Sequence, residues 1–153
     1  MRLLELKVPP PLVAVLIGFA MWKGSLVLPS VDLPHLTHVL LTAAVAIAAA
    51  SFDIAGMISF RRARTSINPM KPDAASALVT SGIYQITRNP MYVGLALWLV
   101  AWAIYLSSPG TLIGPVLLFL YIDRMQIRPE ERVLAAKFGA EYHEYANKVR
   151  RWL

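Results

Sequence analysis

Four apolar segments, separated by short polar ones, constrain the fold of this 153-residue chain more than any other feature. They cover residues 11–28, 36–60, 91–106 and 112–122. A helix of about 17 residues, rising about 1.5 Å per residue, reaches about 25 Å, which approaches the ~30 Å hydrocarbon thickness of a bilayer. Because 57% of all residues are hydrophobic and only 16% are charged, the pattern predicts an all-α integral membrane protein with four transmembrane helices.

The connecting segments organise these spans into a single membrane domain over residues 1–153. We expect an N-terminal helical hairpin in residues 1–67 and a second unit in residues 68–153. In that second unit, the Ser-Ser-Pro-Gly connector at 107–110 predicts an antiparallel hairpin, because it is short and rich in turn-forming residues. The mixed pattern of residues 128–153 predicts a further, amphipathic C-terminal helix on the cytoplasmic side.

The distribution of positive charge predicts the orientation of the chain in the membrane. The net charge is +6, and basic residues gather after the second and the fourth span. These residues are Arg61, Arg62, Arg64, Arg124, Arg128 and Arg132. Because cytoplasmic loops of membrane proteins carry such an excess, we expect both termini to be cytoplasmic. The basic residues flank apolar runs rather than a base-stacking surface, which favours membrane lipids over nucleic acid as partners.

Residue types that commonly bind metals or act as nucleophiles are scarce. The chain has no cysteine, which excludes disulfides, thiolate metal sites and cysteine nucleophiles. The three histidines, His35, His38 and His143, are not accompanied by a carboxylate-rich segment. We therefore predict no metal site and assign no catalytic nucleophile or base.

Asp53 is a carboxylate inside the alanine-rich second span. A charged side chain within a membrane helix costs about 2.5–3.5 kcal/mol on insertion scales unless it is paired, hydrated or protonated. Two roles follow from this cost. Asp53 either serves a cavity or forms a hydrogen bond with a neighbouring helix.

A first polar cluster lies in residues 78–94, LVTSGIYQITRNPMYVG, at the start of the third span. Asn89 and Pro90 fit the N-cap and first turn of a helix by residue type. That role does not account for the remaining polar and aromatic side chains of the cluster, Tyr84, Arg88 and Tyr92. Interfacial tyrosines are common in membrane proteins, so Tyr84 and Tyr92 fit either an aromatic belt or a binding site.

A second polar cluster, RPEER at 128–132, follows the fourth span. Glu130 and Glu131 come directly after Pro129, a position where carboxylates stabilise a helix N-terminus. A carboxylate pair can alternatively receive the ammonium group of a ligand through charge-assisted hydrogen bonds. Together, the two clusters predict a site at a membrane surface.

The two clusters carry a family resemblance. LVTSGIYQITRNPMYVG followed by PEERVLAAKFGAEYHEY resembles the C-terminal core of the isoprenylcysteine carboxyl methyltransferase and phospholipid methyltransferase superfamily. The resemblance covers residues 68–153, which makes that unit a methyltransferase-like core, and Asn89 stands where many members have histidine. It implies an integral membrane enzyme that transfers a methyl group from S-adenosylmethionine directly to a lipophilic or small acceptor.

The resemblance also implies a cofactor site on the cytoplasmic side. Its residues are Ser76, Ala77, Leu78, Val79, Tyr84, Asn89, Pro90, Met91, Tyr92 and Glu130. Among them, Glu130 is expected to meet the amino group of S-adenosylmethionine. Gln126 takes the substrate-binding position at which prenylcysteine methyltransferases have an arginine, which argues against a carboxylate acceptor unless Arg124 or Arg128 replaces that arginine.

Two other classes of protein fit parts of this pattern. Sterol-reductase-type membrane enzymes have a similar C-terminal pattern and use a nicotinamide cofactor, but they are usually much longer than this chain. A non-catalytic membrane scaffold would leave Tyr84, Asn89, Tyr92 and Glu130 without a shared purpose.

Overall fold

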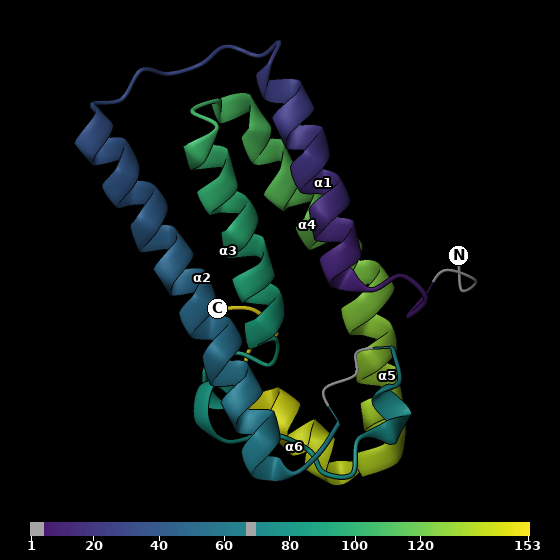
Figure 1. The fold of residues 1–153 in the computed structure, drawn as a ribbon. Coiled ribbons are helices and arrows are strands. Elements are labelled where there is room, and N and C mark those ends of the chain that lie inside the picture. Colours follow the sequence, from purple (N-terminus) through teal and green to yellow (C-terminus); the bar gives the residue numbers. More distant parts are fainter. Residues whose placement is uncertain (1–4, 67–69) are drawn as a thin grey trace.

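The computed structural model describes residues 5–66 and 70–153, and the regular elements in these ranges are all helical (Figure 1). The α-helices are α1 (Pro10–Ser25), α2 (His35–Ala63), α3 (Pro90–Tyr105), α4 (Ile113–Ile122), α5 (Arg128–Phe138) and α6 (Ala140–Lys148). Short 3-10 helices are η2 (Pro72–Ala74), η3 (Gly82–Gln85) and η4 (Pro109–Leu112), and a π-helical segment, η5 (Asp123–Ile127), joins α4 to α5. The all-α prediction is confirmed for the described residues.

Each predicted apolar span corresponds to a helix whose ends lie within three residues of the expected ones. Two continuous helical stretches are long and apolar enough to cross a membrane by length and composition, His35–Ala63 and Pro109–Phe138. Pro10–Ser25 and Pro90–Tyr105 are apolar but shorter. In the second long stretch the apolar sequence ends at Ile122, so the polar helix α5 lies beyond it.

Helix α3 is the centre of the bundle (Figure 1). Helix α2 packs mainly on α3, whereas α1 packs on α3 and α4. The predicted antiparallel pairing of α3 and α4 is confirmed. Helices α1 and α2 lie apart, with α3 between them, so the segment expected to be an N-terminal hairpin is not a tightly packed pair (Figure 1). The expected boundary between residues 67 and 68 lies outside the described residues.

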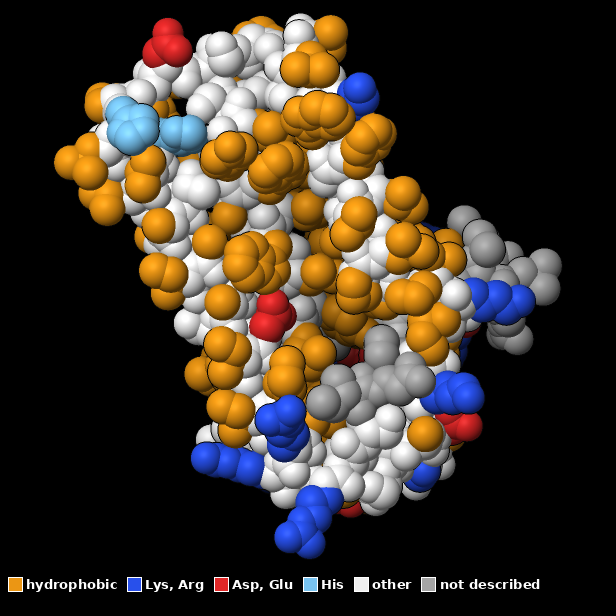
Figure 2. Space-filling view, in the orientation of Figure 1, with side chains coloured by type: hydrophobic (Ala, Val, Ile, Leu, Met, Phe, Trp, Pro, Cys, Tyr) orange, Lys and Arg blue, Asp and Glu red, His pale blue; other side chains and the backbone are white. Residues whose placement is uncertain are grey.

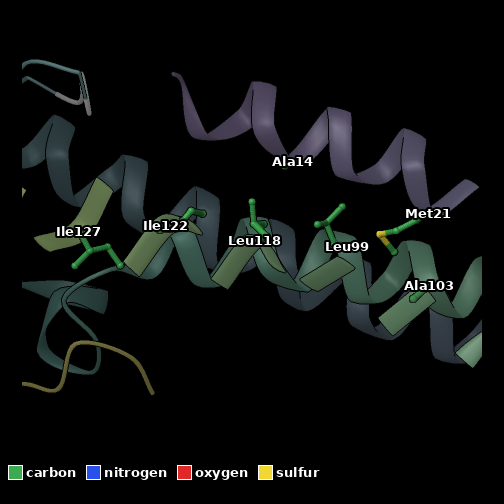
Figure 3. Packing of buried hydrophobic residues seen from close by; sticks show 7 residues of the cluster. All are labelled: Ala14, Met21, Leu99, Ala103, Leu118, Ile122 and Ile127. Carbon is green, nitrogen blue, oxygen red and sulfur yellow. The ribbon is translucent and has the colours of Figure 1, made fainter. Parts of the chain in front are cut away.

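The buried core runs along the contact between α1, α3 and α4 (Figure 3). Its members are Ala14, Met21, Leu99, Ala103, Leu118, Ile122 and Ile127. Small residues let the helices approach closely: a Cβ at Gly114 would collide with Met21, and one at Gly94 would collide with Asp53. This close packing of small residues is how helices associate when the surrounding medium is as apolar as the side chains.

The outer faces of the bundle are apolar over most of its length (Figure 2). Exposed large side chains include Leu12, Val15, Leu16 and Phe19 on α1, Leu36, Leu40, Ile47 and Ile54 on α2, and Ile113, Val116, Leu117 and Leu120 on α4. Apolar surface of this extent marks a membrane or protein contact rather than a surface exposed to water. Most Lys and Arg side chains on the face shown gather at the end that carries α6 (Figure 2).

The polar C-terminal region differs from the single amphipathic helix that the sequence predicted. Gly139, with φ +53°, separates α5 from α6, because a left-handed backbone conformation ends the helix at that point. Pro129 cannot donate a hydrogen bond within the helix, and the carbonyl of Met125 instead accepts one from Leu6 N–H at 3.1 Å. Helix α5 also continues from η5, so Glu130 and Glu131 do not lie at a free helix N-terminus.

Candidate functional site

A cavity of about 370 Å³ lies where α2, α3, α5 and α6 meet. It has the size of a small-molecule site, for which volumes of ~300–1,000 Å³ are usual. Its walls also include Pro10 and Pro11 of α1 and residues of the segment between α2 and α3. Most of the lining is apolar, and the polar groups stand at a few points: Asp53, Ser66, Arg88, Asn89, Glu130, Glu131 and the tyrosines. Apolar walls with a few oriented polar groups are typical of cofactor sites.

Glu130 on α5 and Tyr92 on α3 form the polar centre of the cavity. The Tyr92 hydroxyl donates a hydrogen bond to Glu130 Oε2 at 3.2 Å. Burial raises the pKa of Glu130 from its usual 4.5 to about 7, and the neighbouring carboxylate of Glu131 adds to this. The hydrogen bond from Tyr92 opposes the shift, since it favours the ionised form. A cationic ligand group beside Glu130 would therefore relieve an electrostatic cost that the protein alone does not relieve.

Glu131 has different partners, although it follows Glu130 directly. Its oxygens accept hydrogen bonds from Arg151 Nε at 3.0 Å and Nη2 at 2.7 Å, and one oxygen pairs with Arg88 Nη2 at 3.1 Å. Arg151 also pairs with Asp123 at 3.2 Å. These contacts raise the pKa of Arg151, chiefly through the hydrogen bonds to Glu131. Glu131 thus joins α5 to the chain terminus and to the start of α3.

The C-terminal tail runs beside the segment that leads into α3. Arg88 N–H donates to the carbonyl of Arg150 at 2.9 Å, and the carbonyl of Arg151 accepts from Thr87 Oγ1 at 3.2 Å. The Asn89 side-chain amide also donates to the Arg151 carbonyl, at 2.9 Å. Asn89 occupies the N-cap position of α3, but its side chain makes no capping hydrogen bond. The capping role predicted for its side chain is therefore wrong, because the tail binds the amide instead.

Tyr84 forms another wall through aromatic packing. Its ring packs edge-on against that of Phe60, with the two ring centroids 5.6 Å apart. Its backbone carbonyl accepts a hydrogen bond from the Tyr145 hydroxyl at 2.7 Å. Burial, with the negative charge of Glu130 as a smaller cause, raises the pKa of Tyr84 well above its usual value. Tyr84 therefore stays neutral at physiological pH and offers a ring and a hydroxyl group rather than a charge.

The structure brings eight of the eleven sequence-predicted site residues to the cavity. These are Ala77, Leu78, Val79, Tyr84, Asn89, Met91, Tyr92 and Glu130. Pro90 is buried beneath the start of α3, and Ser76 is exposed, with its N–H donating to Thr65 Oγ1 at 2.8 Å. Gln126 is 1% exposed and hydrogen bonds to Tyr92, so it lies behind the cavity wall rather than on its surface.

Arg88 is a cavity residue that we did not assign to the site from the sequence. Its Nη1 donates to the Tyr142 hydroxyl at 3.1 Å, and its Nη2 pairs with Glu131. The buried Nε has no hydrogen-bond partner within residues 5–66 and 70–153. Its position next to Asn89 in the RNPMY motif could have indicated from the sequence that Arg88 belongs to the site. Tyr142 and Tyr145 also line the cavity, but only the folding of α6 brings them there.

Asp53 meets both of the roles that the sequence left open. Its Oδ2 accepts a hydrogen bond from Trp98 Nε1 at 2.9 Å, which joins α2 to α3. Asp53 also lines the cavity. Gly94 leaves the space that the carboxylate occupies, because any side chain there would collide with it.

Comparison with known proteins gives the class of this protein. The profile of the phospholipid methyltransferase family matches residues 37–141. Protein-S-isoprenylcysteine O-methyltransferase B of Arabidopsis thaliana is 32% identical over 93 residues, which are 61% of this chain and 47% of that enzyme. The protein-S-isoprenylcysteine O-methyltransferase of Saccharomyces cerevisiae is 34% identical over 79 residues, 52% of this chain and 33% of that enzyme.

An uncharacterized protein of Haemophilus influenzae is 44% identical over 63 residues, which are 41% of this chain and all of that protein. The matches confirm the family resemblance that the two polar clusters carry. Since the family profile covers more than half of the chain, this protein belongs to the phospholipid methyltransferase family. The chain spans less than half the length of the two named enzymes.

Proposed function

We propose that this protein is an integral membrane methyltransferase that binds S-adenosylmethionine in the cavity beside Glu130 and methylates a lipophilic or small acceptor. The observation that carries the proposal is the half-buried Glu130 carboxylate, which faces an apolar cavity with only a neutral hydroxyl, from Tyr92, as its hydrogen-bond donor in the described chain. A ligand ammonium group would supply the missing positive charge. Family membership supports the same chemistry.

The polar groups of the cavity suit the amino-acid end of S-adenosylmethionine, which carries an ammonium and a carboxylate. Glu130 would hold the ammonium group, while the unpartnered Nε of Arg88 offers a donor to the carboxylate. The aromatic and aliphatic walls, including Tyr84, Leu78 and Met91, would cover the remaining apolar surface. The residues present therefore fit the cofactor.

The bound cofactor would supply an activated methyl group on its sulfonium. The chain's own contribution is to hold donor and acceptor in line and to exclude water, which can provide much of a rate enhancement when the reacting atoms are about 3–3.5 Å apart. No side-chain nucleophile is needed for such a direct displacement. The apolar lining supports this role, since a desolvated acceptor is more reactive.

Binding of S-adenosylhomocysteine to the purified full chain tests the proposal. We expect calorimetry to show one site per chain and no binding of NADPH under the same conditions. The reverse preference would favour the sterol-reductase-like alternative, and binding of neither compound would favour a scaffold. Either result would overturn the methyltransferase assignment for this chain.

We also propose that all four apolar helices, α1 to α4, cross the membrane and that the cavity opens on the cytoplasmic side. The exposed apolar faces of α1, α2 and α4 support this arrangement, as does the gathering of Lys and Arg at the α6 end (Figure 2). Reporter fusions after Leu153 and in residues 70–81 should then read cytoplasmic, and one near Asp32 should read external. A cytoplasmic signal near Asp32 would contradict four crossings.

A further inference from the structure

We infer that Arg151, which lies outside the cavity, positions Glu130 for the cofactor by holding helix α5 against the entrance of α3. The inference rests on the proposed function and identifies a residue on which cofactor binding depends without direct contact. Arg151 is not among the described residues that line the cavity. It is therefore a positioning residue, and its effect on the ligand passes through Glu130.

Helices α3 and α5 carry the two partners of the polar centre, but they share no extended interface in the described chain. Helix α5 packs on α6, on η2 and on the π-helical junction η5, whereas α3 packs on α1, α2 and α4. The Tyr92 hydroxyl on α3 nevertheless donates to Glu130 on α5 at 3.2 Å. Since hydrogen bonds weaken steeply with distance and angle, a contact outside these two helices must set the separation of the two side chains.

Arg151 contacts both sides of this separation through different groups. Its guanidinium donates to both oxygens of Glu131, from Nε at 3.0 Å and from Nη2 at 2.7 Å, and Glu131 follows Glu130 on α5. Its backbone carbonyl accepts hydrogen bonds from Thr87 Oγ1 at 3.2 Å and from the Asn89 amide at 2.9 Å, directly before α3 begins. One residue thus joins the two helices that form the polar centre.

Arg151 is itself held in place by helix α4 and the junction that follows it. The ring of Trp152, the next residue, packs on Phe119 of α4 with the ring centroids 4.6 Å apart, and it also contacts the buried core. Arg151 Nη1 donates to Asp123 Oδ1 at 3.2 Å, at the start of η5. These contacts fix the link against the helical bundle, so that it can transmit a defined position to α5.

Arg88 provides a second link between the same two helices. Its Nη2 pairs with one oxygen of Glu131 at 3.1 Å. Its backbone N–H donates to the carbonyl of Arg150 at 2.9 Å, so the position of Arg88 also depends on the tail. Removal of the Arg151 side chain would leave Glu131 with this single cationic partner in the described chain, and α5 would be held less firmly.

A double-mutant cycle on S-adenosylhomocysteine affinity tests the inference, by calorimetry on the full chain in lipid nanodiscs at a temperature where each variant is folded. We expect Arg151→Ala to weaken binding by about five- to thirtyfold, but by less than about twofold in the Glu130→Gln background, where the side chain through which Arg151 acts is already altered. Arg151→Lys keeps the charge without the two-pronged guanidinium and should recover part of the affinity. Arg150→Ala, the exposed matched control, should bind like the wild type.

Thr87→Val tests the other side of the link and also decides the question if Arg151→Ala does not fold. It removes the hydroxyl that binds the Arg151 carbonyl and keeps the shape of a side chain that does not line the cavity. Affinity should fall by about two- to fivefold, and only while Glu130 is present. Equal losses in both backgrounds, or wild-type affinity in the folded variants, would overturn the role of Arg151. Failure of the wild type to bind S-adenosylhomocysteine would instead refute the proposed function, so the two failures are distinguishable.

Discussion

The two sides of helix α5 contrast sharply, although adjacent glutamates define them. On the cavity side, Glu130 receives a hydrogen bond from the neutral hydroxyl of Tyr92. On the tail side, Glu131 is held by Arg151 and Arg88. Glu131 therefore stabilises the fold through ion pairs. The negative charge of Glu130 is not balanced by a cation among the described residues. The contrast teaches that a pair of like residues in a motif can divide into a structural and a ligand-binding member.

The largest effect is expected on the tail side. Arg151→Ala would leave Glu131 without two of its hydrogen bonds and would also remove a partner of Asp123. Breaking a buried ion pair costs about 3–5 kcal/mol, and we expect about 2–3 kcal/mol here because the Arg151 side chain is about a third exposed. The measurement is the thermal midpoint by tryptophan fluorescence in detergent.

Arg150→Ala is the matched control for that experiment, because Arg150 is exposed and takes part through its backbone carbonyl. Its midpoint should stay close to that of the wild type. Equal losses in the two variants would mean that overall tail charge, rather than the Arg151 contacts, stabilises the protein.

On the cavity side, Glu130→Gln should weaken S-adenosylhomocysteine binding by about ten- to hundredfold, since one charge-assisted bond is worth about 1.5–3 kcal/mol. The thermal midpoint without ligand should not fall, because the substitution removes an uncompensated charge. Calorimetry on this variant and on Glu141→Gln, an exposed control on α6, measures the difference. Unchanged affinity in folded Glu130→Gln would remove Glu130 from the site.

The pH dependence of binding sharpens the same contrast. With a pKa of about 7, Glu130 in the free protein is mostly protonated below pH 7 and mostly ionised above it. A ligand ammonium favours the ionised form, so binding below pH 7 must release a proton, and affinity should fall by up to about tenfold per pH unit. Above pH 7, affinity should be level. Calorimetry from pH 5.5 to 8 should show this slope in the wild type and lose it in Glu130→Gln.

The smallest effect is expected behind the cavity wall. Gln126→Leu removes the amide that hydrogen bonds to Tyr92, a neutral bond worth about 0.5–1.5 kcal/mol. Affinity for S-adenosylhomocysteine should fall by about two- to tenfold, through a less well positioned Tyr92. A hundredfold loss would show that Gln126 contacts the ligand itself, contrary to its position in the structure.

Local sequence patterns predicted the helices and much of the cavity wall. Apolar runs long enough for a helix depend on consecutive residues, so the spans that became α1 to α4 could be located to within a few residues. The segment 77–92 is also continuous in the chain, and eight of its residues line the cavity. In the C-terminal region, the sequence did not reveal the break at Gly139, because glycine is also tolerated within amphipathic helices.

What each polar side chain does was decided only by the tertiary structure. Asn89 binds the carbonyl of a residue 62 positions away, Glu131 pairs with an arginine 20 positions away, and Asp53 meets a tryptophan 45 positions away. The sequence by itself determined that the chain is helical, strongly apolar and equipped with two polar clusters. Hydrogen bonds and ion pairs depend on distances of a few ångströms between groups that are remote in sequence, so only the packed bundle could separate Glu130 from Glu131.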